Sequence, residues 1–210
     1  MTVKDCFSRD HELNPRKYPM GIDYPSYSRN KFPRKIRRIT LLGNSEMNFI
    51  WHVPKLLGNA LYANLGHARG GSAILMADCI RTNKLDAKVY SIDLFPSNKF
   101  IQKALYYIQK FDVEEWIELC FGSTIEWADK LQDKRFSFVF IDANHTYEAV
   151  RNDFINWAPL VAINGWISFH DTNQTFTHQA IEDAVLKDKQ WKELKDYHIN
   201  SIRTFEKIEI

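Results

Sequence analysis

Residues Phe136–Asp171 read FSFVFIDANHTYEAVRNDFINWAPLVAINGWISFHD, and this stretch decides the fold class. It opens with the apolar run Phe136–Ile141, which has the length of a buried strand. A segment of helical length follows at Thr146–Leu160, with apolar residues recurring on one face, and the apolar run Trp166–Phe169 comes after it. Two apolar strands joined by one helix are typical of a parallel sheet that is buried on both faces.

The same alternation of apolar runs and helical segments continues on both sides of this stretch. Further strands are predicted at Ala60–Leu65, Lys88–Ile92, Ile117–Cys120, Trp191–Leu194 and Ser201–Lys207. Further helices are predicted at Glu46–Leu57, Gly71–Thr82, Ser97–Phe111, Ser123–Leu131 and Thr177–Lys187. The last two strands are close enough in sequence to form an antiparallel hairpin. We therefore predict an α/β fold: a Rossmann-like, doubly wound, mostly parallel sheet of seven strands with helices on both faces.

Composition limits the class of protein. The chain has 210 residues, of which 45% are hydrophobic, 14% aromatic and 26% charged. This is typical of a folded chain and not of a disordered one. No apolar run reaches the ~18 residues that a membrane-spanning helix needs, and the polar N-terminus has no signal-peptide core. Cys6, Cys79 and Cys120 show no metal-ligand spacing, and their isolation fits a reducing compartment. We therefore expect a cytoplasmic protein without membrane contact.

Charge is distributed unevenly along the chain. Residues 1–40 carry a net charge of +6, and the remaining residues carry −4. Six of the ten residues Arg29–Arg38 are basic, and four of the seven prolines lie in the first 40 residues. We predict a basic, extended N-terminal arm over residues 1–45 and a catalytic domain over residues 46–210. The basic cluster has three interpretations: a lid over an anionic acceptor, a contact in a homo-oligomer, or a solvated surface.

Ligands of such sheets bind beyond the carboxyl ends of the strands, where this chain has a glycine-rich turn. The turn Gly66–Ser72 reads GHARGGS. Its glycines allow close approach of a ligand to the backbone, and the helix that follows offers unpaired N–H groups. Asp93 ends the second strand, where an acidic side chain suits the hydroxyls of a ribose. Ser123, after the third strand, caps the next helix or lies beside an adenine ring. The predicted cofactor-binding residues are Gly66, His67, Gly70, Gly71, Ser72, Asp93, Ser123 and Asp142.

Acidic and histidine side chains follow the two strands of the quoted stretch. Asp142 comes directly after the first, and His170 and Asp171 come directly after the second. Neighbouring parallel strands bring these ends together, and two carboxylates with one imidazole can hold a divalent cation. The other interpretation is that His170 and Asp171 only hydrogen-bond the loops. His145, three residues beyond Asp142, is a candidate general base or a capping residue at the helix start.

Together these motifs resemble class I S-adenosylmethionine-dependent methyltransferases. The most similar subgroup contains small metal-dependent sugar and macrolide O-methyltransferases and cephalosporin hydroxylase-like proteins. The resemblance covers about residues 55–175 and rests on an Asp-x-x-His-x-Tyr-x-x-Val-x-x-Asp pattern, a glycine and a His-Asp pair. The matching residues are Asp142, His145, Tyr147, Val150, Asp153, Gly165, His170 and Asp171, with the turn Gly66–Ser72 and Asp93.

The resemblance implies that S-adenosylmethionine (SAM) donates a methyl group to a hydroxyl of a small molecule, such as a sugar or sugar conjugate. A divalent cation (Mg²⁺ or similar) at Asp142, His170 and Asp171 would assist, and Asp142 or His145 would accept the proton. Asn64 or Leu65 stands where the family usually has an acidic residue. The pair His170-Asp171 stands where some relatives have two acids, and an imidazole suits a hard ion such as Mg²⁺ less well.

Other classes of function stay open at this point. A nicotinamide-dependent oxidoreductase would share the glycine turn and Asp93, but the turn is GxxxGG instead of GxGxxG. A catalytically inactive, methyltransferase-like binding module is a second alternative. Nucleic acid is not the favoured acceptor, because only the basic arm supports it and IDANH replaces the Pro-Pro motif of many amino-directed enzymes.

Overall fold

The computed structural model describes residues 36–209. They form one seven-stranded sheet in the order β3-β2-β1-β4-β5-β7-β6. Five strands are parallel, and β7 is antiparallel to both of its neighbours. The strands are β1 Leu61–Leu65, β2 Lys88–Asp93, β3 Ile117–Phe121, β4 Phe136–Ile141, β5 Val161–Phe169, β6 Trp191–Glu193 and β7 Arg203–Lys207. The predicted fold class, including the antiparallel C-terminal pair, is confirmed.

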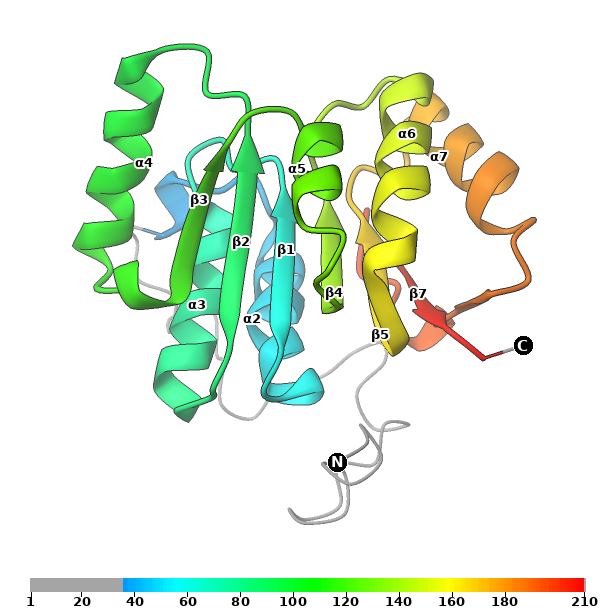
Figure 1. Cartoon of the computed structure of the whole chain (residues 1–210), viewed down its shortest axis with the longest axis horizontal. Coiled ribbons are helices and arrows are strands. Elements are labelled where there is room, and N and C mark those ends of the chain that lie inside the picture. Colours follow the sequence, from blue (N-terminus) through cyan, green and yellow to red (C-terminus); the bar gives the residue numbers. More distant parts are fainter. Residues whose placement is uncertain (1–35, 210) are drawn as a thin grey trace.

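Helices cover both faces of this sheet (Figure 1). One face packs against α2, α3 and α4, and the other packs against α5, α6 and α7. The bounds are α2 Asn44–Leu57, α3 Gly71–Asn83, α4 Asn98–Lys110, α5 Thr124–Lys130, α6 Tyr147–Trp157 and α7 Thr175–Ala180. Strand order reverses between β1 and β4, so this is the point where a ligand of a doubly wound sheet binds.

The two layers of core follow from the alternation of side chains along each strand. Phe138 and Phe140 of β4 face the α2–α3 side, whereas Val139 and Ile141 face the α5–α6 side. Three of these four residues are fully buried, and Ile141 is 3% exposed. Burying such a side chain contributes roughly 1.5–3 kcal/mol. This two-sided burial is the reason why the strands are almost continuously apolar.

Strand β5 begins at Val161 and is longer than the predicted strand Trp166–Phe169. A kink lies inside the strand, at the position where a turn before it was expected. The register against β4 shifts between the pairs Phe136–Val161 and Phe138–Trp166. Asn164 adopts φ 63° within this bulge. A Cβ on Gly165 would lie 2.8 Å from the Ala162 carbonyl oxygen, so the kink requires glycine at that position. The final helix also differs: α7 begins at Thr175 and continues as a π-helical turn at Ile181–Val185.

The end of the predicted arm packs on the domain. Ile36, Ile39 and Leu42 are buried in the same core cluster as α2 and α3. Arg37 and Arg38 are exposed, and the other residues of the basic cluster Arg29–Arg38 lie outside the described residues. Within residues 36–209, no helix has the length and apolarity needed to cross a membrane.

Candidate functional site

A cavity of about 540 Å³ lies at the carboxyl ends of β1, β2, β3 and β4. Each of these strands contributes the residues that directly follow it, and α6 closes one side. The volume is in the range of small-molecule and cofactor sites. Four predicted cofactor-binding residues line it, namely Gly66, Asp93, Ser123 and Asp142. A smaller adjoining cavity of about 150 Å³ is lined by Gly66 and Asp142 again, and by His67, Gly71 and Ser72.

The backbone of the glycine turn has a conformation that would be strained for residues with a side chain. Gly66 has φ +95°, and a Cβ there would lie 2.1 Å from the Asp142 carbonyl oxygen. Gly70 has φ +87° and precedes the first turn of α3. A Cβ on Gly71 would lie 2.4 Å from Cβ of Thr40. The turn therefore lies against the end of β4 at Gly66 and against Thr40 at Gly71, and glycine is the residue that permits both approaches.

A buried network of hydrogen bonds links the glycine turn to the ends of β1 and β2. The Asn64 side-chain amide donates to the Gly66 carbonyl oxygen and to the Ser91 hydroxyl, each at 3.0 Å. His67 Nδ1 lies 2.8 Å from the same hydroxyl. Burial lowers the pKa of His67 to about 4, against the raising effect of Asp93, so the ring is neutral at pH 7. Asn64 is fully buried and lines neither cavity, so its side chain supports the turn and does not face the candidate cofactor site.

Asp93 closes the glycine turn at its other end. Its Oδ2 accepts a hydrogen bond from the Ala68 amide at 2.8 Å, and its Oδ1 accepts one from the Phe95 amide at 3.2 Å. A carboxylate has about four acceptor positions, so two stay available toward the cavity. The arrangement places a fixed negative charge where the ribose of a nucleoside cofactor is expected.

Ser123 caps α5, as one of the two predictions for it stated. Its hydroxyl accepts a hydrogen bond from the Glu126 amide at 3.1 Å, and the Glu126 carboxylate accepts one from the Ser123 amide at 3.3 Å. Ser123 also lines the large cavity, so the cap and a position beside a ligand coexist.

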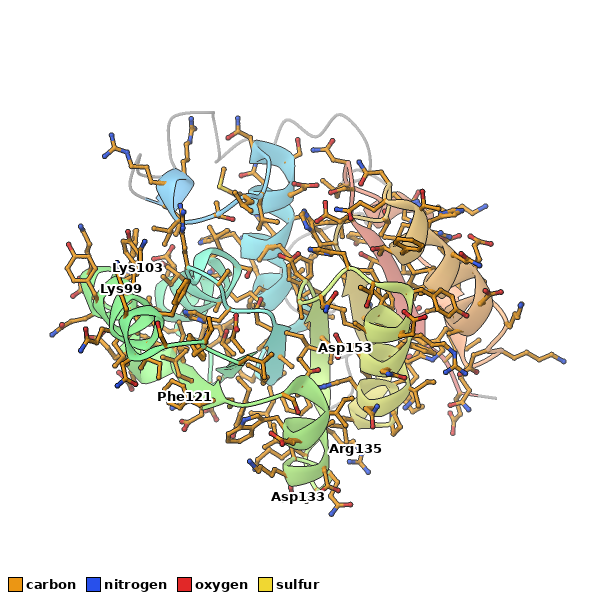
Figure 2. All side chains as sticks on the ribbon, turned by 90° about the horizontal axis from the view of Figure 1, so that it is seen from above. Lys99, Lys103, Phe121, Asp133, Arg135 and Asp153 are labelled. Carbon is orange, nitrogen blue, oxygen red and sulfur yellow. The ribbon has the colours of Figure 1, made fainter. Side chains whose placement is uncertain are left out.

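Asp153 on α6 is a cavity residue for which the sequence suggested no role. It is 4% exposed and accepts a hydrogen bond from the Thr124 hydroxyl. Burial raises its pKa to about 6, although this hydrogen bond lowers it. In the view of Figure 2, Asp153 is near the middle of the molecule, whereas Asp133 and Arg135 are nearer its lower margin. Asp153 is part of the motif that carries the resemblance, but only the packing of α5 on α6 brings it to the cavity.

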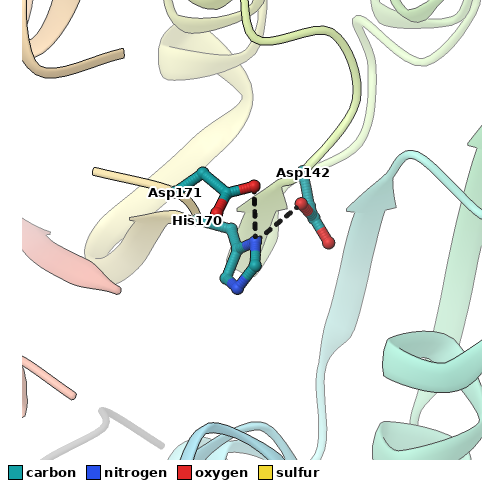
Figure 3. A group of neighbouring side chains, drawn as sticks. All are labelled: Asp142, His170 and Asp171. Carbon is teal, nitrogen blue, oxygen red and sulfur yellow. Dashed lines mark hydrogen bonds and ion pairs between the residues drawn. The ribbon is translucent and has the colours of Figure 1, made fainter. Parts of the chain in front are cut away.

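Asp142, His170 and Asp171 come together as predicted (Figure 3). His170 Nδ1 lies 3.0 Å from Asp142 Oδ1 and 3.3 Å from Asp171 Oδ2. One ligand atom from each of the three residues lies within 4.8 Å of the others. Asp142 also lines both cavities, so this cluster adjoins the candidate cofactor site.

Glu46 of α2 adds a third carboxylate that sequence analysis missed. Its Oε2 lies 3.6 Å from His170 Nε2, and both side chains are less than a tenth exposed. Burial alone would lower the pKa of His170, but Asp142, Glu46 and Asp171 raise it to about 10. Burial would likewise raise the pKa of Glu46, but the nearby His170 ring and hydrogen bonds from Ser201 and Gly43 lower it to about 2. No sequence signal marks this pair, because an acid at a helix start is ordinarily solvated.

The donor set fits a divalent cation. Two carboxylates and one imidazole are the ligand types that Mn²⁺, Fe²⁺ or Zn²⁺ accept, and Mg²⁺ prefers oxygen alone. The three donors converge at the mouth of the sheet, and Asp142 and Asp171 are both partly exposed. His145 lies at the edge of the cluster, with Nε2 3.5 Å from Asp171 Oδ2 and a third of its side chain exposed.

A family model matches just over half of the chain. The model described as "Methyltransferase domain" matches residues 63–172, which include the glycine turn, Asp93, Asp142, His145 and the His170-Asp171 pair. No curated protein matches the chain significantly.

Solved structures share the fold at low sequence identity. The O-methyltransferase from Bacillus cereus in complex with S-adenosylhomocysteine (SAH) has a TM-score of 0.67 at 14% identity, over 86% of this chain and 94% of that one. The O-methyltransferase TomG from Streptomyces achromogenes, in complex with SAM, has 0.66 at 11% identity, over 80% and 82%. An rRNA methylase from Streptococcus thermophilus has 0.59 at 11% identity, over 81% and 99%. The shared fold therefore does not decide the acceptor.

Proposed function

The chain belongs to the family of methyltransferase domains, and on this premise we propose that it is a SAM-dependent O-methyltransferase. Its substrate in this proposal is a hydroxyl group of a small molecule, such as a sugar or sugar conjugate, and a divalent cation assists the transfer. One observation carries the proposal: Asp142 lines the large cavity and also belongs to the cluster with His170 and Asp171. A single side chain thus joins the cofactor site to the cation site.

The large cavity supports SAM as the cofactor. Asp93 would accept hydrogen bonds from the ribose hydroxyls, and Ser123 lies where the adenine ring would be. Gly66, Gly70 and Gly71 would let the methionyl part approach the backbone. The printed descriptions of the Bacillus cereus and Streptomyces achromogenes structures name SAH and SAM as their ligands, and family membership favours SAM over a nicotinamide cofactor.

Methyl transfer to a hydroxyl requires that the acceptor oxygen is oriented toward the donor and loses its proton. A divalent cation at Asp142, His170 and Asp171 would lower the pKa of the acceptor hydroxyl. His145 is the candidate base for this proton, since its ring is partly exposed beside Asp171. Asp142 suits the base role less well, because it already contacts His170 and would also hold the cation.

A hydroxyl acceptor, rather than an amine of a nucleic-acid base, is the form of the proposal that the site favours. A cation held by two carboxylates would bind a hydroxyl oxygen and lower its pKa, whereas an exocyclic base amine offers no such oxygen.

We also propose a cytoplasmic location, which the two described cysteines support. Cys79 and Cys120 are free and buried, and burial raises the pKa of each thiol to about 12, as expected of unreactive core residues.

A methyl-transfer assay tests this function. The full chain is incubated with SAM and a panel of hydroxylated small molecules, with and without EDTA, and SAH is measured. We expect turnover that EDTA abolishes and Mn²⁺ restores, and loss of turnover in Asp171→Ala. The exposed Asp133→Ala serves as the matched control and should keep full activity.

Three outcomes of this assay change the proposal in different ways. Full activity in both EDTA and Asp171→Ala would remove the cation from the mechanism. SAH binding without turnover across the panel would favour an inactive binding module. A separate titration, monitored by tryptophan fluorescence, compares NAD with SAH. Binding of NAD and not of SAH would overturn the assignment of the cofactor.

A further inference from the structure

The two ring nitrogens of His170 face different carboxylates. Nδ1 faces Asp142 at 3.0 Å and Asp171 at 3.3 Å, whereas Nε2 faces Glu46 at 3.6 Å. The two nitrogens of an imidazole point away from each other, so an ion bound at Nδ1 is out of reach of a carboxylate at Nε2. Glu46 therefore lies on the side of the His170 ring away from the candidate cation site and is not a fourth ligand of that site.

Glu46 is held in this place by hydrogen bonds to both of its carboxylate oxygens. Oε1 accepts from the Ser201 hydroxyl at 2.6 Å and from the Ser201 amide at 3.1 Å. Oε2 accepts from the Gly43 amide at 2.7 Å. Glu46 is only 5% exposed. A helix-capping carboxylate is ordinarily solvated, and burying one is costly unless it is paired. The three hydrogen bonds compensate this burial and fix the carboxylate beside His170.

We propose that Glu46 is a positioning residue for the cation site: its carboxylate faces the buried Nε2 of His170 at 3.6 Å and favours a proton there, so that the Nδ1 lone pair stays directed at the ion between Asp142 and Asp171. This inference rests on the cation assistance in the proposed function. Histidine ligands of metals commonly donate their other ring N–H to a carboxylate, which fixes the tautomer and the ring orientation. Here that carboxylate comes from α2, a helix that precedes the whole βα core.

Cation and cofactor binding by the full chain test this role. Titration calorimetry with Mn²⁺ and, separately, with SAH compares the unchanged protein with Glu46→Gln and Ser201→Ala. Gln keeps the size of the side chain but loses its charge, and Ser201→Ala removes one support of Glu46 without touching His170. We expect Glu46→Gln to weaken Mn²⁺ binding by about 10- to 100-fold. SAH binding should change less than twofold in both variants, and Mn²⁺ binding by Ser201→Ala should stay close to that of the unchanged protein.

The position of the histidine proton gives a second measurement. In the Zn²⁺-loaded unchanged protein, the ¹⁵N chemical shifts of His170 should place the proton on Nε2. A proton on Nδ1 would overturn the proposal.

The remaining outcomes separate this proposal from the function on which it rests. Mn²⁺ binding by Glu46→Gln equal to that of the unchanged protein overturns the positioning role and leaves the cation site intact. Parallel losses of Mn²⁺ and SAH affinity and of melting temperature in both variants mean that Glu46 only stabilises the fold. If the unchanged protein binds SAH but no Mn²⁺, the cation assistance fails together with the inference.

Discussion

Gly66 lies so close to Asp142 that a Cβ on the glycine would be 2.1 Å from the Asp142 carbonyl oxygen. The Asp142 amide also donates to the carbonyl oxygen of Leu65, the residue before the glycine, at 2.9 Å. The end of β1 and the end of β4 are thus locked together at the point where strand order reverses. The glycine turn and the carboxylate shared by the two candidate sites form one rigid unit.

We expect Gly66→Ala to destabilise the protein and to weaken SAH binding. The new methyl group would displace the Asp142 backbone, and φ +95° is strained for alanine, so the loss in unfolding free energy should reach about 2 kcal/mol or more. Urea unfolding and SAH titration measure both effects. Gly43→Ala is the control, because Gly43 has φ −65° and its nearest atom is the end of the Glu46 side chain at 3.3 Å. Equal stability of Gly66→Ala and the unchanged protein would contradict the rigid unit.

Asp93→Asn tests the ribose interaction. The amide loses the charge and one acceptor group, and a hydrogen bond to a charged group contributes roughly 1.5–3 kcal/mol. We therefore expect SAH affinity to fall by about 10- to 100-fold. Tryptophan fluorescence titration with SAH measures the change. Asp86→Asn is the matched control, because Asp86 is an exposed acid at the amino ends of the strands, opposite the candidate site. SAH affinity of Asp93→Asn within twofold of the unchanged protein would place the ribose elsewhere.

His145→Gln tests the general base. Removal of a base lowers turnover by roughly 10²- to 10⁴-fold. Binding of SAH and Mn²⁺ should stay within about threefold, since His145 lies at the edge of the carboxylate cluster and lines neither cavity. The rate of SAH formation at saturating substrate measures the effect. His178→Gln, on the exposed surface of α7, should leave the rate unchanged. If His145→Gln keeps its rate, the proton goes to Asp142 or to solvent.

Asp153 makes stability depend on pH. Its pKa is raised to about 6, from 3.8, because it is buried. Between about pH 4 and pH 6 the folded protein holds a proton that the unfolded chain has released, so this group costs stability as the pH rises through that window. Asp153→Asn can still accept from Thr124 but cannot ionise. The unfolding free energy of Asp153→Asn minus that of the unchanged protein should therefore increase by about 2 kcal/mol between pH 4 and pH 8.

Urea unfolding at both pH values measures this effect. The control is Asp129→Asn, at an exposed position of α5, the helix that carries Thr124. Its unfolding free energy should change with pH in the same way as that of the unchanged protein. A pH profile of Asp153→Asn that also runs parallel would mean that Asp153 titrates alike in the folded and unfolded states.

Local pattern was sufficient for most of the fold because the sheet is buried on both faces. The run Phe136–Ile141 is apolar on both sides, and this marks β4 and its parallel neighbours directly. The kink in β5 was not predictable, because a glycine after a polar residue is typical of a turn and also of a bulge. Only the pairing with β4 distinguishes the two, since the register shift falls between Phe136 and Phe138.

The succession of strands and helices along the chain and the polar residues at strand ends could be predicted without the structure, because both depend on short-range periodicity and on the geometry of parallel strands. Three features depend on the packing of the folded chain: Asn64 donates to Ser91, Asp153 reaches the cavity, and Glu46 lies beside His170. Each of them joins elements far apart in the chain. Their existence depends on how helices pack on the sheet, which sets the burial, and therefore the charge and hydrogen bonding, of each polar side chain.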